Sequence, residues 1–239
     1  MNNINKGKVY LIPSTIAEHT YDKVITPQVI EVIKNTGYFL VENIRTARRY
    51  ISSLQLGMVI EDLQFEVLDK KTDVAAARRL LDPVQNGRDC GIISEAGCPG
   101  IADPGASAVK WAHEFGIAVV PLVGPSSILL ALMASGFSGQ SFVFHGYLPI
   151  PQGERKQAIE RLESAARKIH QTQIFMETPY RNDKLMEDIL QSCHSGTMLC
   201  IAKDITSADE MIVSKSVGEW KQSKPTLHKS PVIFLIFAG

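Results

Sequence analysis

The sequence has no apolar run long enough to span a membrane, since a spanning helix needs about 20 consecutive apolar residues. Its opening residues, Met-Asn-Asn-Ile-Asn-Lys, lack the apolar stretch of a secretory signal, so we expect a cytoplasmic protein without membrane contact. The four cysteines are scattered and form no Cys-x-x-Cys pair, and the six histidines show no metal-ligand spacing. Reduced thiols and no bound metal are therefore expected.

The net charge is zero, because 25 basic side chains balance 25 acidic ones. No global field attracts a polyanion, so a nucleic-acid substrate needs a local basic patch. The best candidate is a set of arginines spaced three and four apart in one predicted helix, with two more further along the chain; these are Arg45, Arg48, Arg49, Arg78 and Arg79. A solvated helix face explains the same pattern.

Two nucleotide-binding motifs are absent as well. Gly-x-Gly-x-x-Gly does not follow the first predicted strand, and Gly-x-x-x-x-Gly-Lys-Ser/Thr does not occur. These absences exclude the usual dinucleotide fingerprint and the P-loop nucleotidases.

What the sequence does contain is a regular alternation of strands and helices in its first half. Strands are predicted over 8–12, 38–41, 63–67, 91–93 and 117–123, with helices between them. This order predicts an α/β fold whose N-terminal sheet is parallel and doubly wound. From residue 124 on there are fewer helices per strand, so we expect a C-terminal sheet, mixed or antiparallel, with helices. The predicted domains are residues 1–123 and 124–239, and the charge-rich helix over 155–170 is expected to be solvated.

The stretch from Cys90 to Gly105 carries most of the functional argument. It predicts the end of a buried strand, a long loop of small residues, and a helix with Asp103 as N-cap and Pro104 at its first position. Open α/β sheets bind ligands in the crevice outside the carboxyl ends of their strands. Gly97 and Gly100 have no Cβ and let the main chain approach a ligand. An ordinary connection rich in turn formers gives the same pattern.

A second small-residue corner, Gly124-Pro125-Ser126-Ser127, follows the last strand of this half and opens an apolar helix. Its hydroxyls can cap the helix, and free N–H groups at a helix start favour electron-rich or anionic ligand groups. Helix capping alone is the alternative.

Five segments together match one family in order and spacing. They are residues 9–13 (Val-Tyr-Leu-Ile-Pro), 94–99 (Ser-Glu-Ala-Gly-Cys-Pro) with 103–105 (Asp-Pro-Gly), 120–126 (Val-Pro-Leu-Val-Gly-Pro-Ser), 146–149 (Gly-Tyr-Leu-Pro) and 177–181 (Glu-Thr-Pro-Tyr-Arg). Over nearly its whole length the chain resembles the tetrapyrrole (corrin/porphyrin) methylase superfamily. Within it, the chain is most similar to the bacterial small-subunit ribosomal RNA (cytidine-2′-O-)-methyltransferase I branch.

The resemblance implies a two-domain α/β fold with a mixed C-terminal sheet, a homodimer, and S-adenosyl-L-methionine bound in a cleft between the domains. The cofactor contacts that it implies come from both domains; they are Pro13, Ser94, Glu95, Ala96, Gly97, Cys98, Ile101, Ser126, Ser127, Met176, Ala202 and Pro231. The implied function is methylation of a ribose 2′-hydroxyl, with ribosomal RNA or the small-subunit particle as partner.

Methyl transfer to a ribose hydroxyl needs a base that takes its proton. Glu42 and Lys203 are the predicted bases and Arg45 the predicted anchor for phosphate or substrate, although a surface ion pair accounts for each equally well. Several motifs depart from the branch, including Tyr180 where its members carry histidine. Two alternatives therefore stay open: methylation of a tetrapyrrole or other small molecule, and a non-catalytic module that binds S-adenosylmethionine.

Overall fold

The computed structural model of this chain describes residues 5–238. Residues 1–4, which open the segment inspected for a secretory signal, and residue 239 lie outside that range. The chain divides between Ser126 and Ser127 into two compact units, close to the boundary expected after Val123. Within the described range no helix combines the length and the apolarity needed to cross a bilayer.

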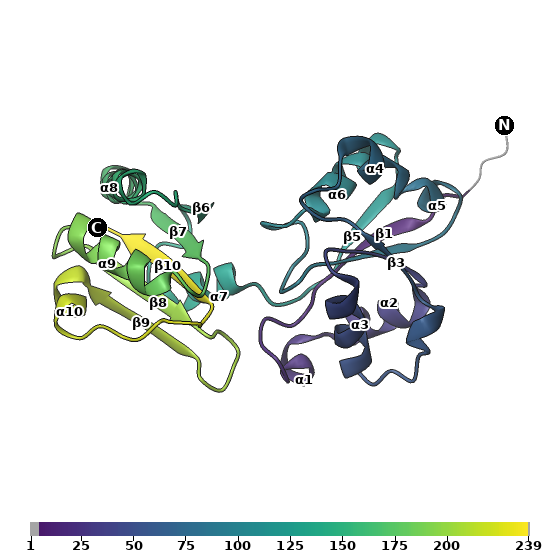
Figure 1. Ribbon diagram of the computed structural model, residues 1–239, viewed down its shortest axis with the longest axis horizontal. Coiled ribbons are helices and arrows are strands. Elements are labelled where there is room, and N and C mark those ends of the chain that lie inside the picture. Colours follow the sequence, from purple (N-terminus) through teal and green to yellow (C-terminus); the bar gives the residue numbers. More distant parts are fainter. Residues whose placement is uncertain (1–4, 239) are drawn as a thin grey trace. The chain divides into compact units, whose positions relative to one another are not determined.

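Sheet A forms the centre of the first unit (Figure 1). Its strand order is β3 (Gln64–Val67), β2 (Tyr38–Val41), β4 (Cys90–Ile93), β1 (Lys8–Ile12) and β5 (Ala118–Pro121), and every neighbouring pair is parallel. β2 and β4 are buried along their whole length. Parallel sheets are covered by helices on both faces, which is why these strands are apolar throughout. The predicted parallel, doubly wound sheet is confirmed.

Helices cover both faces of sheet A (Figure 1). One face carries α1 (Tyr21–Val24), α2 (Pro27–Asn35), α3 (Ile44–Ser53) and the 3₁₀ helix η1 (Ile60–Asp62), and the other carries α4 (Val74–Arg79), α5 (Asp82–Gln85) and α6 (Gly105–Glu114). Alternate strand residues separate two cores: Phe39 and Val41 pack with α2 and α3, whereas Tyr38 and Leu40 pack with α4 and α6. The connection after β1 therefore leaves toward one face of the sheet, and the connection after β4 toward the opposite face.

Capping residues mark the N-termini of helices in both units. The Thr26 hydroxyl accepts a hydrogen bond from the N–H of the third helical residue, and Pro27 occupies the first helical position. The Asp73 carboxylate caps α4 in the same way at 2.7 Å. At α10 (Val217–Gln222) Ser216 and Glu219 form a capping box.

Sheet B forms the second unit. Its strand order is β6 (Phe142–Tyr147), β7 (Thr172–Glu177), β10 (Val232–Phe237), β8 (Met198–Lys203) and β9 (Met211–Ser216). β6 and β7 are parallel and the other neighbouring pairs are antiparallel, so the predicted mixed sheet is confirmed. The central strand, β10, consists of β-branched, aromatic and leucine residues and is almost entirely buried.

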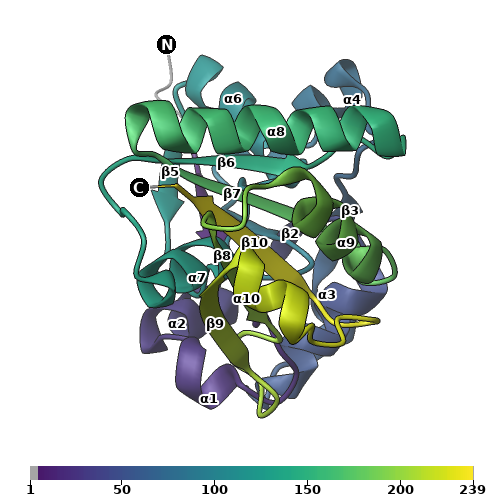
Figure 2. The same ribbon diagram turned by 90° about the vertical axis from the view of Figure 1, so that its left-hand side faces the viewer.

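Helices cover both faces of sheet B. α8 (Gln152–Ile169), α9 (Asn182–Ser192) and α10 pack on one face (Figure 2). The rings of Phe175 and Phe234 stack beneath them with centroids 5.9 Å apart. α7 (Ser127–Ser135) packs on the other face, where its Ala131 and Leu132 join Ile233 in a second core.

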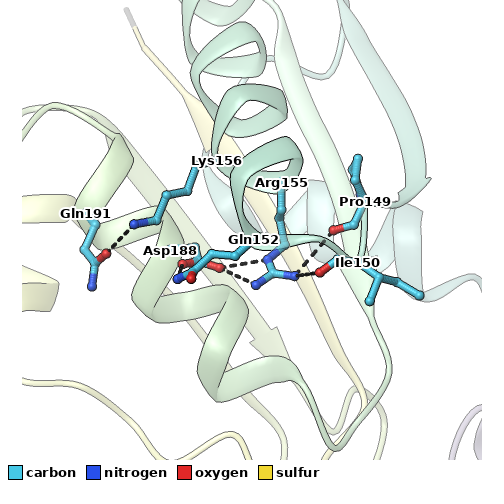
Figure 3. A network of polar contacts seen from close by, with 7 residues as sticks. All are labelled: Pro149, Ile150, Gln152, Arg155, Lys156, Asp188 and Gln191. Carbon is cyan, nitrogen blue, oxygen red and sulfur yellow. Dashed lines mark hydrogen bonds and ion pairs between the residues drawn. The ribbon is translucent and has the colours of Figure 1, made fainter.

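The prediction that the charge-rich helix, α8, is solvated is wrong at two positions. Arg155 and Glu163 are buried. The Arg155 guanidinium donates two hydrogen bonds to one Asp188 carboxylate oxygen, at 2.6 and 2.8 Å, and another to the carbonyl of Ile150 at 2.6 Å (Figure 3). Glu163 accepts the N–H of His194 at 2.8 Å. These charges turn inward because hydrogen bonds and a counter-ion replace their hydration.

Replacing Asp188 with asparagine is expected to lower the free energy of unfolding of the second unit by about 3–5 kcal/mol, because the Arg155 charge loses its buried counter-ion. Urea unfolding followed by Trp220 fluorescence measures this in a Trp111→Phe background, since these are the two tryptophans of the chain. The matched control, Lys156→Ala, removes an exposed contact to Gln191 and is expected to change the free energy by less than about 0.5 kcal/mol. An unfolding midpoint of Asp188→Asn equal to that of the parent contradicts the prediction.

Candidate functional site

The loop after β4 is fastened to the start of α6 by one carboxylate. Asp103 accepts hydrogen bonds from the backbone N–H groups of Gly100 at 2.9 Å and Gly105 at 2.7 Å. α6 begins at Gly105 with Pro104 in the N-cap position, so the predicted start, with Asp103 as N-cap, lies one residue too early. The reason is that Asp103 bridges the loop and the first turn, which leaves Pro104 outside the helix.

Two glycines let three segments of the first unit meet at the carboxyl end of sheet A. Gly97 has a φ of 71°, and a Cβ there would lie 3.1 Å from the carbonyl oxygen of Pro125. A Cβ on Gly124 would lie 2.2 Å from the Cβ of Pro13, far closer than real Cβ contacts. The Cys98 thiol donates to the Pro125 carbonyl at 3.3 Å. The loop after β4, the turn after β5 and the end of β1 are therefore in direct contact.

Gly97 and Gly100, both expected to let the main chain approach a ligand, have different surroundings. The position of a Cβ at Gly97 is close to the protein's own carbonyl at Pro125. Gly100 has a φ of 84°, and nothing lies within 4 Å of the position that a Cβ would take. Its neighbour in sequence, Ile101, is 55 % exposed, and Val123, beside the other corner, is 72 % exposed. The side of the loop around Gly100 and Ile101 is thus open.

A cavity of about 630 Å³ opens within the first unit beside this corner; we call it the α3 cavity. Its walls are residues 14–19 after β1, the side chains of α3 with residues just before and after it, and Ser94 and Glu95 from the loop after β4. Ser14 ties the first wall to the third. Its N–H donates to the Gly97 carbonyl at 2.9 Å, and its hydroxyl donates to the Ser94 carbonyl at 3.2 Å.

The α3 cavity lies where two neighbouring strands, β1 and β4, send their connections to opposite faces of sheet A. Ligands of open α/β sheets bind at such a point. Tyr50 of α3 lines the cavity and donates its hydroxyl to the Pro13 carbonyl at 2.8 Å. Burial raises the pKa of Tyr50, so this hydroxyl stays protonated at neutral pH. The site therefore has a rigid wall on the α3 side.

Glu42, one of the two predicted bases, directly follows β2 and is not part of the lining of the α3 cavity. It lines a much smaller pocket together with Asp103, and Ser94 lines both. Partial burial raises the pKa of Glu42, and the carboxylates of Asp103 and Glu95 raise it further, against the lowering effect of the Glu95 hydrogen bond and of Lys70. A raised pKa makes this carboxylate a stronger proton acceptor than an ordinary glutamate.

The five arginines expected to bind RNA do not form one patch. Three are exposed on α3 and two on α4, over the opposite face of sheet A; they are Arg45, Arg48 and Arg49, and Arg78 and Arg79. The guanidinium of Arg48 lies 5.5 Å from the ring centroid of Phe65. Arg49 lines the α3 cavity. Arg45, the predicted anchor, is in the first turn of α3, beside the cavity-lining residues Asn43 and Thr46 in sequence.

Three cofactor contacts predicted in the second unit gather at one end of sheet B. Met176 of β7 and Ala202 of β8 both pair with Ile233 of β10. Pro231 lies just before β10, and its carbonyl accepts a hydrogen bond from the N–H of Asp204 at 3.0 Å. The sequence did not identify Ile233, although it pairs with two of the predicted residues.

Lys203, the other predicted base, ends β8 in the second unit. Its Nζ lies 3.4 Å from a carboxylate oxygen of Asp204. Asp204 and Thr206 have φ values of 51° and 71°, a strained conformation for residues with side chains. Of the two predicted serines, Ser126 ends the first unit and Ser127 starts α7.

Among residues 5–238, His, Cys, Asp and Glu side chains nowhere gather in groups of three that could hold a metal ion. The four cysteines are free, as the sequence predicts. Burial raises the pKa of the Cys98 thiol, which therefore stays protonated at neutral pH.

Comparison with known proteins decides the family. The family described as Tetrapyrrole (Corrin/Porphyrin) Methylases matches residues 22–221. The chain belongs to this family. The predicted methylase superfamily is thereby confirmed, and with it the expectation of a methyltransferase.

Two relatives among these methylases carry the name Ribosomal RNA small subunit methyltransferase I. The protein of Buchnera aphidicola subsp. Schizaphis graminum is 28 % identical over 243 residues, which cover 100 % of this chain and 81 % of the relative. That of Streptococcus pyogenes is 30 % identical over 221 residues, which cover 89 % and 70 %. The uroporphyrin-III C-methyl transferase from Thermus thermophilus, solved in complex with S-adenyl homocysteine, has a TM-score of 0.56 at 16 % identity over 97 % of both chains, which shows a shared fold. The predicted branch is confirmed by the named relatives.

Sequence reasoning missed most of the α3 cavity of this methylase. Residues 14–19 received no role, and Tyr50 and Arg49 were not recognised as its lining. A signal for the first set existed, because the hydroxyl residues Ser14 and Thr15 follow the carboxyl end of a strand. The lining from α3 depends on how that helix is rotated against the sheet, which its charge pattern does not reveal.

A Gly124→Ala substitution is expected to destabilise the first unit by about 1–3 kcal/mol, because the new methyl group overlaps the Pro13 ring and one of the two segments must move. Hydrogen-exchange mass spectrometry of the peptides that contain Pro13 and Gly124 measures the change. Gly37→Ala is the matched control, since a Cβ at Gly37 meets its nearest atom at 3.7 Å, an ordinary contact. Equal protection of both peptides in Gly124→Ala and Gly37→Ala is incompatible with the proposed constraint.

Proposed function

We propose that this protein is an S-adenosylmethionine-dependent methyltransferase that acts on a ribose 2′-hydroxyl of small-subunit ribosomal RNA, as a homodimer in the cytoplasm. The observation that carries the proposal is a shared wall in the first unit. Ser94 and Glu95 belong both to the predicted cofactor loop and to the α3 cavity, and Ser94 also lines the small pocket of Glu42. A donor loop, an acceptor cavity and a base thus adjoin, as transfer between two bound molecules requires.

The residues present fit S-adenosylmethionine. Gly100 leaves the main chain open, and the exposed apolar side chains of Ile101 and Val123 offer a surface for an adenine ring. We assign the remaining contacts to the residues that the family resemblance implies, namely Pro13, Ala96, Gly97, Cys98, Ser126, Ser127, Met176, Ala202 and Pro231. When bound, the cofactor supplies a methyl group on a sulfonium, which needs no strongly polar pocket at the sulfur.

The protein's own contribution to the chemistry is a base and an ordered acceptor. A ribose hydroxyl is a poor nucleophile until its proton is removed. Glu42 takes this proton as the hydroxyl oxygen forms its bond to the methyl group. Its raised pKa suits it better than Lys203, whose Nζ forms an ion pair with Asp204.

The charge of the α3 cavity argues against the alternative tetrapyrrole acceptor. Glu18 and Glu95 line it together with one arginine, Arg49, and one histidine, His19. Uroporphyrin-type molecules carry several carboxylates, and such an acceptor needs more cations than this lining provides. The relatives named as ribosomal RNA methyltransferases match along the whole chain. The acceptor that we propose follows from both observations.

Small ribosomal subunits from a strain that lacks this activity are expected to accept labelled methyl groups from S-adenosylmethionine when the purified protein is added, and subunits from the complemented strain are not. The label should appear on a ribose after nuclease digestion. Calorimetry with S-adenosylhomocysteine should show binding to the same preparation. Binding without transfer to any RNA supports the non-catalytic module, and transfer to a tetrapyrrole but not to RNA supports the alternative enzyme.

Glu42→Gln is expected to lower kcat by roughly 100- to 10,000-fold, because the amide cannot take the proton. In the parent, kcat/KM should fall as the pH drops through the Glu42 pKa, at a higher pH than an ordinary carboxyl gives, because burial raises that pKa. The exposed control Glu31→Gln should keep the parent's pH profile.

Glu42→Gln is not expected to lower the stability of the fold, although it lowers kcat. Because the pKa of Glu42 is raised in the folded state, the unfolded chain loses this proton first, and stability falls as the pH rises between the two values. Glu42→Gln should therefore be at least as stable as the parent at neutral pH. A variant that loses activity through unfolding at neutral pH contradicts the role of base.

A further inference from the structure

The α3 cavity has the size and the lining of a binding site for one small polar molecule. Its volume of about 630 Å³ falls within the range of roughly 300–1,000 Å³ that is usual for such sites. Two of its lining residues, His19 and Gln55, have φ values of 59° and 52°. Strained backbone at residues with side chains collects at ligand sites, because only function maintains it.

The polar groups of the cavity favour a hydrogen-bonding occupant that carries one negatively charged group. Donors and acceptors come from hydroxyls and amides, of which Ser14, Thr46 and Asn43 are examples. Arg49 is the arginine of the lining, and the carboxylates of Glu18 and Glu95 repel a polyanion. A nucleoside with one flanking phosphate fits this balance.

The lining of the α3 cavity also includes an aromatic side chain that could stack on a base. Tyr21 lines the cavity and is half-buried, with its ring packed in part against the core beneath α2 and α3. Single nucleotides of RNA are recognised by stacking an unstacked base on aromatic rings or guanidinium planes. Enzymes that modify a nucleotide often turn it out of its strand, because the reacting group is otherwise out of reach.

We propose that the α3 cavity receives the acceptor nucleoside, turned out of its RNA strand, with Tyr21 against the base and Arg49 on an adjoining phosphate. This rests on the proposed function and adds the place and the form in which its substrate binds. Glu42 lines a separate, much smaller pocket, and Ser94 lines both that pocket and the α3 cavity, so an acceptor held at this wall adjoins the group that takes its proton. The exposed Arg45 and Arg48, on the same helix, then serve the neighbouring phosphates.

Two variants test the cavity by different means. Arg49→Ala removes its arginine, and Thr46→Phe fills part of its volume without changing the charge. Arg161→Ala is the matched control, because it removes an exposed arginine on α8 that does not belong to the five candidate RNA-binding arginines. Three quantities are measured for each: methyl transfer to small subunits, calorimetric binding of S-adenosylhomocysteine, and binding of cytidine 5′-monophosphate by saturation-transfer NMR.

Both cavity variants are expected to lose about tenfold or more in kcat/KM for transfer and to lose the nucleotide signal, with S-adenosylhomocysteine affinity within about twofold of the parent. Arg161→Ala should match the parent in all three. Transfer that survives both cavity variants overturns the inference. A parallel loss of S-adenosylhomocysteine binding also overturns it, because the cavity then belongs to the cofactor.

Failure of the proposed function looks different. In that case the parent itself binds S-adenosylhomocysteine and transfers nothing to RNA, before any variant is compared. Nucleotide binding by the parent that Arg49→Ala abolishes supports the cavity's assignment independently of turnover.

Discussion

The contact between Gly124 and the ring of Pro13 is the constraint on which the candidate site depends. β1 lies between β4 and β5 in sheet A, so the segments that follow all three strands emerge at one edge. They close on one another only because position 124 carries no side chain and because Gly97 admits the Pro125 carbonyl. Once they have closed, Ser14 bonds the loop after β4, and Ser94 and Glu95 become the wall of a cavity. Ser94 also lines the smaller pocket that contains Glu42.

The two units treat buried charge in contrasting ways. In the second unit Arg155 and Asp188 are nearly inaccessible, and each satisfies the other with the help of main-chain carbonyls. Such a pair specifies one arrangement of α8 and α9. In the first unit Glu42 is partly buried among other carboxylates with one N–H donor and a distant lysine to compensate. Incomplete compensation raises the pKa of this carboxyl, and groups with shifted pKa values collect at functional sites.

Much of the fold could be predicted from the sequence because its signals are local. Apolar runs gave the strands of sheet A, and alternation with helices gave their parallel order. The start of α6 was placed one residue early because the Asp103 carboxylate bonds across the loop as well as along the helix. The prediction that α8 is solvated was wrong for a similar reason. The partner of Arg155 is Asp188, on another helix, and the spacing of charges within α8 does not reveal it.

The candidate site was predictable only in part. Glycines and serines marked the two corners, but the sequence did not show that Gly97 faces the protein's own Pro125. The α3 cavity escaped notice because its lining comes from three separate segments, each ordinary by itself. Arg49 and Arg48 are adjacent in sequence, and only the rotation of α3 places one in the cavity and the other over Phe65.

The position of β10 has a consequence for the order in which the chain acquires its structure. All strands of sheet A lie between residues 8 and 121, so this sheet can pair completely while later residues are still being synthesised. Sheet B cannot, because Val232–Phe237 is its central strand and joins β7 to β8. Until that strand emerges from the ribosome, two apolar strands have unpaired edges, and such edges invite aggregation. We therefore expect a chaperone to protect the chain most while the second unit is incomplete, because the edges of β7 and β8 are then unpaired.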